Sequence, residues 1–295
     1  MTLLSKPLSK AEGVSSQPNQ SLMRGLVFTY LGFFILLPLV ALVWQATKRP
    51  FSDLWQLTLS PVAVDAYKLT FASALLAAAI NSIFGLILAW ILVRYEFPGR
   101  RLADGLVDMP FAMPGVVAGI TLVSLYAPGG LLGQFFDPGT PLGNLFQSFG
   151  VEEVNLSSSI AGVLMAQIFS TLPFVVRTVQ PVLTELEPEV EESAYTLGAS
   201  PWQTFWRVLL PQLLPALLTG FTLAVARGIG EFGIIFLISG NIPHETLVAT
   251  VYIFQRLEEF DYSGATAVAL VLLALSLVLL TGINLLQRWS RRYDF

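Results

Sequence analysis

Six apolar stretches, each long enough to cross a lipid bilayer, constrain the fold of this chain more than any other feature. They run approximately over residues 25–46, 69–93, 105–127, 159–183, 211–239 and 263–286. A bilayer core about 30 Å thick takes about 20 apolar residues per helical span, and lipid leaves the backbone to satisfy its own hydrogen bonds within helices. The sequence therefore predicts an all-α polytopic membrane protein with about six transmembrane helices.

Composition leaves little room for a soluble domain. Of the 295 residues, 54% are hydrophobic and 12% are charged, about half the charged share of a soluble domain. Residues 1–24 are rich in Ser, Pro, Gln and Asn and are predicted to be a disordered tail, followed by an uncleaved first span. We expect a transmembrane domain over 25–288, with its largest inner connection at 184–210, and a short tail over 289–295.

The basic residues predict the orientation of the spans. With the N-terminus in the cytoplasm, most of the 16 Lys and Arg residues fall in inner segments, as the positive-inside rule requires. Lys48, Arg49, Lys68 and Arg256 then lie outside, and Arg227 lies within the fifth stretch. Although Lys48 and Arg49 run against the bias, we expect both termini to be cytoplasmic.

The sequence lacks the residues that several kinds of metal, nucleotide and catalytic site require. The chain has no cysteine and one histidine, His244, which excludes disulfides and a Cys/His metal cage of three or four ligands. None of its lysines follows a glycine, as the phosphate-binding loop of an ATPase requires, and neither G-x-S-x-G nor H-E-x-x-H occurs. We expect no metal, no cofactor, no catalytic residue and no nucleic-acid partner for this chain.

The third stretch carries three helix-disturbing residues, Asp108, Pro110 and Pro114. Proline inside a membrane helix frees carbonyl groups and bends the axis. We expect one kinked span here, in which the kink serves either packing or gating. In the second stretch, Asn81 is predicted to form an interhelical hydrogen bond.

The inner connection 184–210 contains residues that typically start and end helices, which predicts two short helices. Pro188 suits a first helical position, and Gly198 is a natural helix stop. Ser200 then opens a second helix, with Gln203 completing a capping box. The residues alone leave two interpretations open: an ordinary solvated acidic loop, or an elbow that a partner grips.

A spaced motif runs through this connection: Glu192-Ser193-Ala194, Gly198, Val208 and Leu210-Pro211. It resembles the E-A-A-x-x-x-G-x9-I-x-L-P signature of bacterial ABC importer permeases, with Ser193 and Val208 in place of Ala and Ile. The resemblance implies a type I ABC importer permease fold and a separate ATPase subunit that binds the ATP. It also implies that Glu192, Ser193, Ala194 and Gly198 contact that ATPase.

The fifth stretch contains two charged residues four positions apart, Arg227 and Glu231. A charge in the bilayer core costs at least about 2.5–3.5 kcal/mol, and this spacing on one helix face allows the two to pair. The pair is either a structural salt bridge or part of a translocation pathway. Small residues at Gly220, Ala224 and Gly228 permit close helix packing, so we expect this helix at the centre of the bundle.

The segment around this pair, Ala226 to Gly233, resembles the A-R-x-x-G-E-[FY]-G segment of sulfate and molybdate importer permeases. Residues 239–243, 260–267 and 283–289 are similar to the sulfate/thiosulfate branch of that family. The resemblance implies an importer of sulfate and thiosulfate in the bacterial plasma membrane. Its implied partners are ATPase subunits, a second related permease subunit and an extracytoplasmic sulfate-binding protein; the alternative is a molybdate or tungstate permease.

Overall fold

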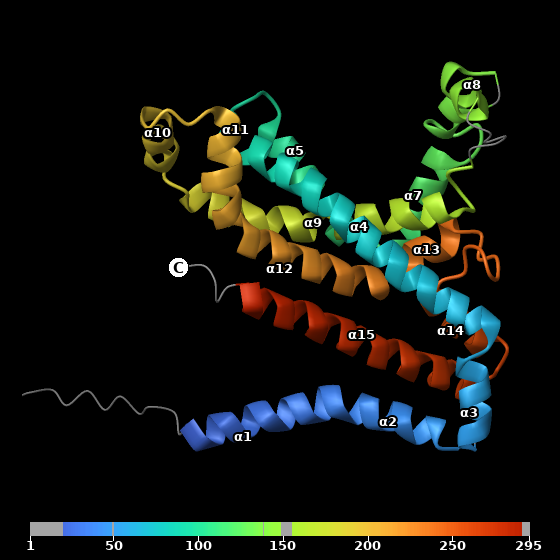
Figure 1. The fold of residues 1–295 in the computed structure, drawn as a ribbon. Helices are drawn as coiled ribbons and strands as arrows, with labels where there is room; N and C mark the ends of the chain where they lie inside the picture. The colour runs from blue at the N-terminus through green and yellow to red at the C-terminus, as the bar shows by residue number, and fades with distance from the viewer. Residues whose placement is uncertain (1–19, 49, 138, 149–154, 291–295) are drawn as a thin grey trace, which may run out of the picture. The chain divides into compact units, whose positions relative to one another are not determined.

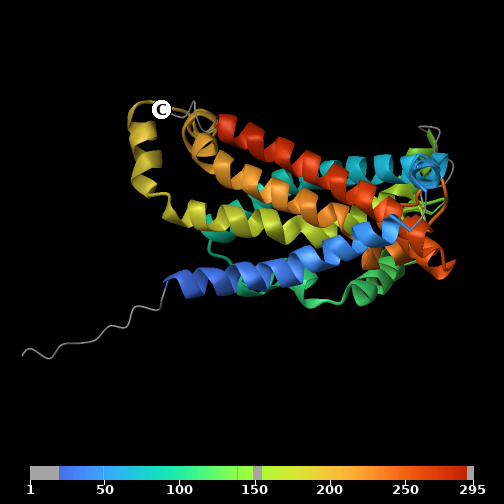
Figure 2. The same ribbon diagram turned by 90° about the horizontal axis from the view of Figure 1, so that it is seen from below.

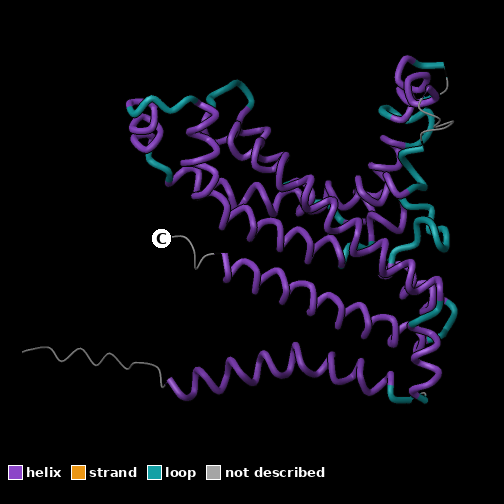
Figure 3. Tube along the Cα trace, in the orientation of Figure 1, coloured by secondary structure: helices purple, strands orange, loops and turns teal. Residues whose placement is uncertain are grey.

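The structure is a computed structural model that describes residues 20–48, 50–137, 139–148 and 155–290. Every regular element in these residues is helical (Figure 3), so the prediction of an all-α chain is confirmed. The chain separates into two compact units, Met1–Gln45 and Ala46–Phe295. Of the predicted tails, residues 1–19 and 291–295 lie outside the described residues and stay predictions, whereas residues 20–24 and 289–290 belong to helices.

The first unit is one apolar helix with an irregular turn in its middle. It comprises α1 (Gln20–Leu31), a π-helical turn (Gly32–Leu36) and α2 (Leu37–Ala46). Most of its long apolar side chains are exposed, as they would be on a helix surrounded by lipid. This helix is the first predicted span.

The second unit is built on four long helices joined by shorter ones (Figure 1). The long helices are α4 (Pro61–Arg94), α9 (Ile160–Glu185), α12 (Leu210–Ile229) and α15 (Tyr262–Ser290). The shorter helices are α3 (Phe51–Thr58), α5 (Arg100–Val107), α6 (Met109–Ala112), α7 (Gly115–Tyr126), α8 (Pro141–Ser148), α10 (Pro188–Thr196), α11 (Pro201–Thr204), α13 (Gly233–Ile238) and α14 (Ala249–Glu258). A 3₁₀ turn at Gly133–Phe136 precedes α8, and a π-helical turn at Phe205–Leu209 joins α11 to α12.

Helices α4, α9 and α12 pack against one another and form the core of the second unit (Figure 2). Small side chains make this close approach possible: Ala74, Ala78 and Ala224 are essentially buried. The side-chain amide of Asn81 on α4 donates hydrogen bonds to two groups on α9, the carbonyl of Ile168 at 2.9 Å and the hydroxyl of Thr171 at 2.8 Å. The predicted interhelical hydrogen bond of Asn81 is therefore confirmed.

The third apolar stretch does not form the single kinked span that the sequence predicts. It is divided into α5, α6 and α7, with breaks at Asp108 and at Met113–Pro114. Pro114 has no N–H to donate and forces the residue before it out of the helical region, and Met113 accordingly has φ −87° and ψ 130°. Helix α7 has 12 residues and is about 18 Å long, too short to cross the bilayer alone.

The fifth stretch is also divided. Helix α12 ends at Ile229, and α13 begins at Gly233. Three glycines in this segment weaken the helix, and Gly233 then allows α13 to cross α7 closely. A Cβ atom placed on Gly233 would lie 3.3 Å from the Cα atom of Gly115.

Five helices among the described residues are long and apolar enough to cross a membrane: Met23–Ala46, Pro61–Arg94, Ile160–Glu185, Pro201–Ile229 and Tyr262–Leu285. They match five of the six predicted stretches, the fifth stretch only as far as Ile229, and the third stretch contains no helix of this length. Within the second unit, α10 and α11 lie at one end, and α8 and α14 lie at the other (Figure 1). The loops predicted to be inside and outside are thus at opposite ends of the helices.

Candidate functional site

The connection between α9 and α12 folds into the two-helix elbow that the sequence predicts. Helix α10 begins at Pro188 and is followed by Gly198, whose φ of +81° reverses the chain. The Ser200 hydroxyl accepts a hydrogen bond from the backbone N–H of Gln203 at 3.3 Å, and the Gln203 side chain accepts one from the N–H of Ser200 at 2.9 Å. These reciprocal bonds are the predicted capping box, which fixes the start of α11.

The four predicted contact residues do not share one face of this elbow. Glu192, Ser193 and Gly198 are exposed, whereas Ala194 is 9% exposed, on a helix that packs against α11 and the π-helical turn after it. Ala194 therefore lies on the side of α10 that faces the rest of the chain, and its predicted contact with a partner stays a prediction.

Large apolar side chains that the sequence analysis overlooked extend the exposed face of the elbow. Leu197 is 88% exposed, beside Gly198, and Trp202 on α11 is 70% exposed. Tyr195 and Trp206 are also exposed. Long apolar residues in an otherwise polar connection are the signal that could have identified them, because exposed apolar clusters mark interaction surfaces.

The elbow is attached to the end of α4. Arg94 and Glu191 form an ion pair at 2.7 Å, and each side chain is 21% exposed. Arg94 also lies over the ring of Trp90, 5.8 Å from its centroid, and Trp90 contacts Phe205 edge-on with ring centroids 5.9 Å apart. These side chains join α10 and the turn after α11 to the end of α4, the second predicted span.

Arg227 and Glu231 form the predicted ion pair, with 2.7 Å between the Arg227 guanidinium and the Glu231 carboxylate. They do not share one helix, because α12 ends at Ile229 and Glu231 lies in the turn before α13. Glu231 is 2% exposed, whereas the Arg227 side chain is 43% exposed. The pair is therefore asymmetric, with a buried anion holding a cation that reaches an accessible surface.

Glu231 has a second structural role that the sequence did not reveal. Its carboxylate accepts a hydrogen bond from the backbone N–H of Ile234 at 3.3 Å, in the first turn of α13. Its backbone carbonyl accepts one from the hydroxyl of Thr250 at 2.8 Å, at the start of α14. Glu231 thus fixes the break between α12 and α13.

Close packing around α12 agrees with its predicted central position. A Cβ atom added to Gly220 would lie 2.9 Å from the Cα atom of Val175 on α9. One added to Gly228 would lie 3.3 Å from the Cβ atom of Ala74 on α4. The predicted small-residue pattern therefore serves contacts with both neighbouring long helices.

A cluster of polar side chains that the sequence analysis did not bring together surrounds Arg177 on α9. The Arg177 guanidinium binds both carboxylate oxygens of Asp108 at 2.8 and 2.6 Å. It also donates to Asp104 and Gln180, at 2.7 and 2.6 Å. These hydrogen bonds and ion pairs lower the pKa of Asp104, first through Gln180 and then through Arg177.

Comparisons with known proteins show the family to which this chain belongs. Residues 81–292 match the family described as binding-protein-dependent transport system inner membrane components. The chain is 48% identical to the sulfate transport system permease protein CysT of Synechococcus elongatus, covering 90% of this chain and 91% of the relative. It is 45% identical to a probable sulfate transport system permease protein of Chlorokybus atmophyticus, covering 98% and 96%.

A solved structure agrees on the fold. The crystal structure of a bacterial alginate ABC transporter, in complex with a periplasmic protein bound to alginate pentasaccharide, contains a chain that superimposes with a TM-score of 0.69. That match covers 92% of this chain and 94% of the other at 19% identity, and it shows the fold alone. Taken with the family match, it means that this multi-pass membrane protein belongs to the binding-protein-dependent transport system inner membrane components.

Proposed function

We propose that this chain is the membrane-spanning permease subunit of an ATP-driven importer that carries sulfate and thiosulfate into the cytoplasm. The observation that carries the proposal is the 45–48% identity, over at least 90% of the chain, to relatives named as sulfate transport permeases. In this proposal the chain lies in the bacterial plasma membrane with both termini in the cytoplasm. It catalyses no covalent chemistry, because ATP is bound and hydrolysed by a separate subunit.

The elbow formed by α10 and α11 is the proposed docking site for the ATPase. Its exposed residues, among them Glu192, Ser193 and Leu197, would enter a cleft of that subunit. The ion pair between Glu191 and Arg94 would then pass the movement of α10 to α4. Because α4 packs on α9 and α12, closure of the ATPase subunits would shift the helices of the core.

The anion would pass between this chain and a second, related permease subunit. Sulfate is a dianion, and hydrogen-bond donors with limited fixed charge bind it without holding it too tightly. The half-exposed guanidinium of Arg227, partly neutralised by the buried Glu231, offers such a donor. An extracytoplasmic binding protein would deliver the anion to the end of the bundle that carries α8 and α14.

Labelled sulfate uptake by cells that lack this chain tests the proposal. Uptake should fall to background and return when the chain is supplied, and excess thiosulfate should compete with it. Excess molybdate should not compete at equal concentration. Normal sulfate uptake without the chain, or loss of molybdate uptake alone, would contradict the sulfate assignment.

A further inference from the structure

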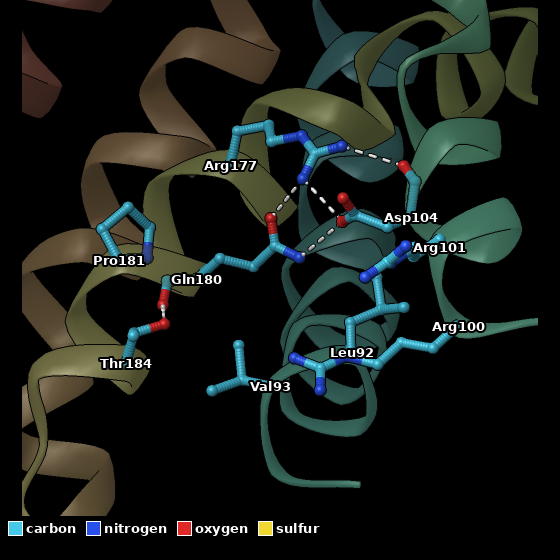
Figure 4. A pocket seen from close by; sticks show the side chains of 9 residues that line it. All are labelled: Leu92, Val93, Arg100, Arg101, Asp104, Arg177, Gln180, Pro181 and Thr184. Carbon is cyan, nitrogen blue, oxygen red and sulfur yellow. Dashed lines mark hydrogen bonds and ion pairs between the residues drawn. The ribbon is translucent and has the colours of Figure 1, made fainter. Parts of the chain in front are cut away.

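A pocket of about 520 Å³ lies where the end of α4, the start of α5 and the last turns of α9 meet (Figure 4). Leu92, Val93 and Pro181 form its apolar walls, and Arg100, Arg101, Asp104 and Arg177 give it charge. It is separate from the Arg227–Glu231 pair and from the exposed face of the elbow. Three arginines against one aspartate make it a basic pocket.

The positive charge of Arg177 is already paired with carboxylates of the same chain. All five N–H donors of its guanidinium are used: by Asp108 twice, by the side chain and the carbonyl of Asp104, and by Gln180. Arg177 therefore fixes the positions of Asp104 and Gln180 in the pocket wall and has no N–H donor left for a ligand. The available positive charge belongs to Arg100 and Arg101.

Arg100 and Arg101 have no directly bonded acidic partner among the described residues. The charge of Arg100 does act on Asp104 from a longer distance, but the Asp104 carboxylate is hydrogen-bonded to Arg177 and Gln180. Neither the Arg100 nor the Arg101 side chain forms a hydrogen bond or an ion pair within 4 Å in the described part of the chain, and the first turn of α5, in which both lie, holds no acidic residue. Gly99 precedes them with φ +87° and offers no side chain to cap the helix. Two cations thus stand at the positive end of a helix, where an anion is favoured and a cation is not.

The surroundings of this pocket are those of a membrane interface. Tyr95 and Phe97, in the turn between α4 and α5, are 58% and 36% exposed. A second hollow next to Phe97 shares Arg100 and Arg101 with the pocket, and Glu96 lines this hollow but not the pocket itself. Aromatic and basic side chains gather where the hydrocarbon meets the headgroups, and basic pockets between membrane helices on the cytoplasmic side bind anionic headgroups.

We propose that this pocket binds the phosphate of an anionic phospholipid headgroup through Arg100 and Arg101. The inference rests on the proposed orientation, which places the end of α4 on the cytoplasmic side. A free tetrahedral oxyanion such as sulfate shares the same chemistry, but the apolar walls and the flanking aromatic residues favour a lipid. The bound headgroup joins α5 to the end of α4, next to the Arg94 side chain that holds the elbow.

Ligand-induced thermal stabilisation of the assembly purified through this chain in detergent tests the proposal. The probes are dioctanoyl phosphatidylglycerol, dioctanoyl phosphatidylcholine, and sodium sulfate against sodium chloride at equal ionic strength. Phosphatidylglycerol should stabilise the wild type, and Arg100→Gln with Arg101→Gln should weaken its apparent affinity about tenfold or more, since hydrogen bonds to a charged group are lost. Arg207→Gln is the control, because Arg207 is an exposed arginine on the elbow side outside the pocket.

The outcomes separate the sources of the anion. Stabilisation by phosphatidylglycerol alone that the double variant weakens assigns the site to a lipid, whereas a variant-sensitive effect of sulfate alone assigns it to a free oxyanion. Equal titrations in the wild type and the double variant, or an equal loss in Arg207→Gln, would overturn the site. Should the Gln variant purify poorly, Arg100→Lys with Arg101→Lys keeps the charge, and an undiminished phosphatidylglycerol response in it would overturn the role of the guanidinium groups.

The measurement does not depend on transport. If no ATPase co-purifies and no sulfate is carried, the proposed function fails while the lipid titration still gives its answer. If transport is normal and the titrations are unaffected by Arg100 and Arg101, the pocket alone is withdrawn.

Discussion

Arg177 shows how one side chain can stabilise an interrupted span. Its guanidinium joins α9 to Asp104 and Asp108, which stand on either side of the last turn of α5. A bidentate contact with Asp108 fixes the geometry as well as the charge. The break between α5 and α6 is therefore held by hydrogen bonds from a neighbouring helix.

Asp104→Asn should lower the stability of the purified protein at neutral pH, and the loss should shrink in acid. The folded-state pKa of Asp104 lies below its ordinary value of 3.8, so its contribution is present above that value and is lost as the pH falls through the lower folded pKa. The carboxylate is 44% exposed, so solvent limits the effect to about 1 kcal/mol or less. Thermal unfolding at pH 7 and near pH 3 measures it.

Glu258→Gln provides the control for this pH dependence, because Glu258 is exposed. It should unfold like the wild type at both pH values. A loss in Asp104→Asn that is unchanged or larger in acid would show that the charge of Asp104 does not stabilise the fold.

Removal of one charge from the Arg227–Glu231 pair should damage the protein more than removal of both. Arg227→Met leaves the nearly buried Glu231 carboxylate without its cation, whereas the double variant Arg227→Met with Glu231→Gln leaves no charge and keeps an acceptor for Ile234. A double-mutant cycle on the free energy of unfolding in detergent should give a coupling of about 0.5–3 kcal/mol. The same cycle on Arg256 and Glu259, a pair at 3.3 Å whose carboxylate is 62% exposed, should give about 1 kcal/mol or less.

The uptake of sulfate per folded complex then separates packing from transport. If Arg227 contributes to the anion pathway, the double variant should insert normally and transport poorly. Full uptake by the double variant would reduce the pair to a structural role.

At the scale of elements, the elbow depends on a turn that only certain residues accept. Gly198 has φ +81°, a conformation that glycine adopts freely, that Asn tolerates and that β-branched residues resist. We expect Gly198→Val to insert but to lose most co-purification of the ATPase, and Gly198→Asn to retain it. Gly99→Val is the matched control, since Gly99 has φ +87° in a different turn with no atom near its Cβ position.

The comparison of the two glycine variants decides the role of the elbow. Equal co-purification of the ATPase with the wild type and with Gly198→Val would remove the elbow from the docking site. Equal loss in Gly99→Val would instead attribute the effect to general strain.

The elements that could be predicted from sequence are those specified by local residues. Long apolar runs predict α4, α9 and α15, and the Pro and Gly positions around α10 and α11 predict the elbow. The divided third stretch was missed because hydropathy continues through 109–113 while the backbone conformation there changes at Pro114. The helix ends there because Pro114 has no N–H and holds Met113 outside the helical region, whereas the sequence analysis predicts only a kink.

Contacts between distant residues could not be predicted in this way. The pair of Arg94 with Glu191 and the pair of Arg177 with Asp108 join residues from different helices, and no local pattern specifies their partners. Ala194 is nearly buried within its own chain, which the small size of the residue alone does not predict. The roles predicted for the exposed elbow residues stay predictions.

At the scale of the whole molecule, the account requires that the two ends of the helices face different compartments. The chain contains no cysteine, so single cysteines at Ser200 and Gly139 can be labelled against an empty background. An impermeant thiol reagent should label residue 139 in spheroplasts, and residue 200 only after the membrane is opened. Labelling of residue 200 in intact spheroplasts would show that the orientation is the opposite of the proposed one. The elbow and the lipid pocket would then lie on the outer side of the membrane.

The most direct measurement is the accumulation of labelled sulfate in proteoliposomes that contain the purified assembly, with ATP enclosed on the elbow side and the sulfate-binding protein on the other. We expect accumulation that requires ATP hydrolysis and the binding protein, that thiosulfate reduces, and that Gly198→Val abolishes through loss of the ATPase. Sulfate accumulation driven by an ion gradient without ATP would contradict the proposed function.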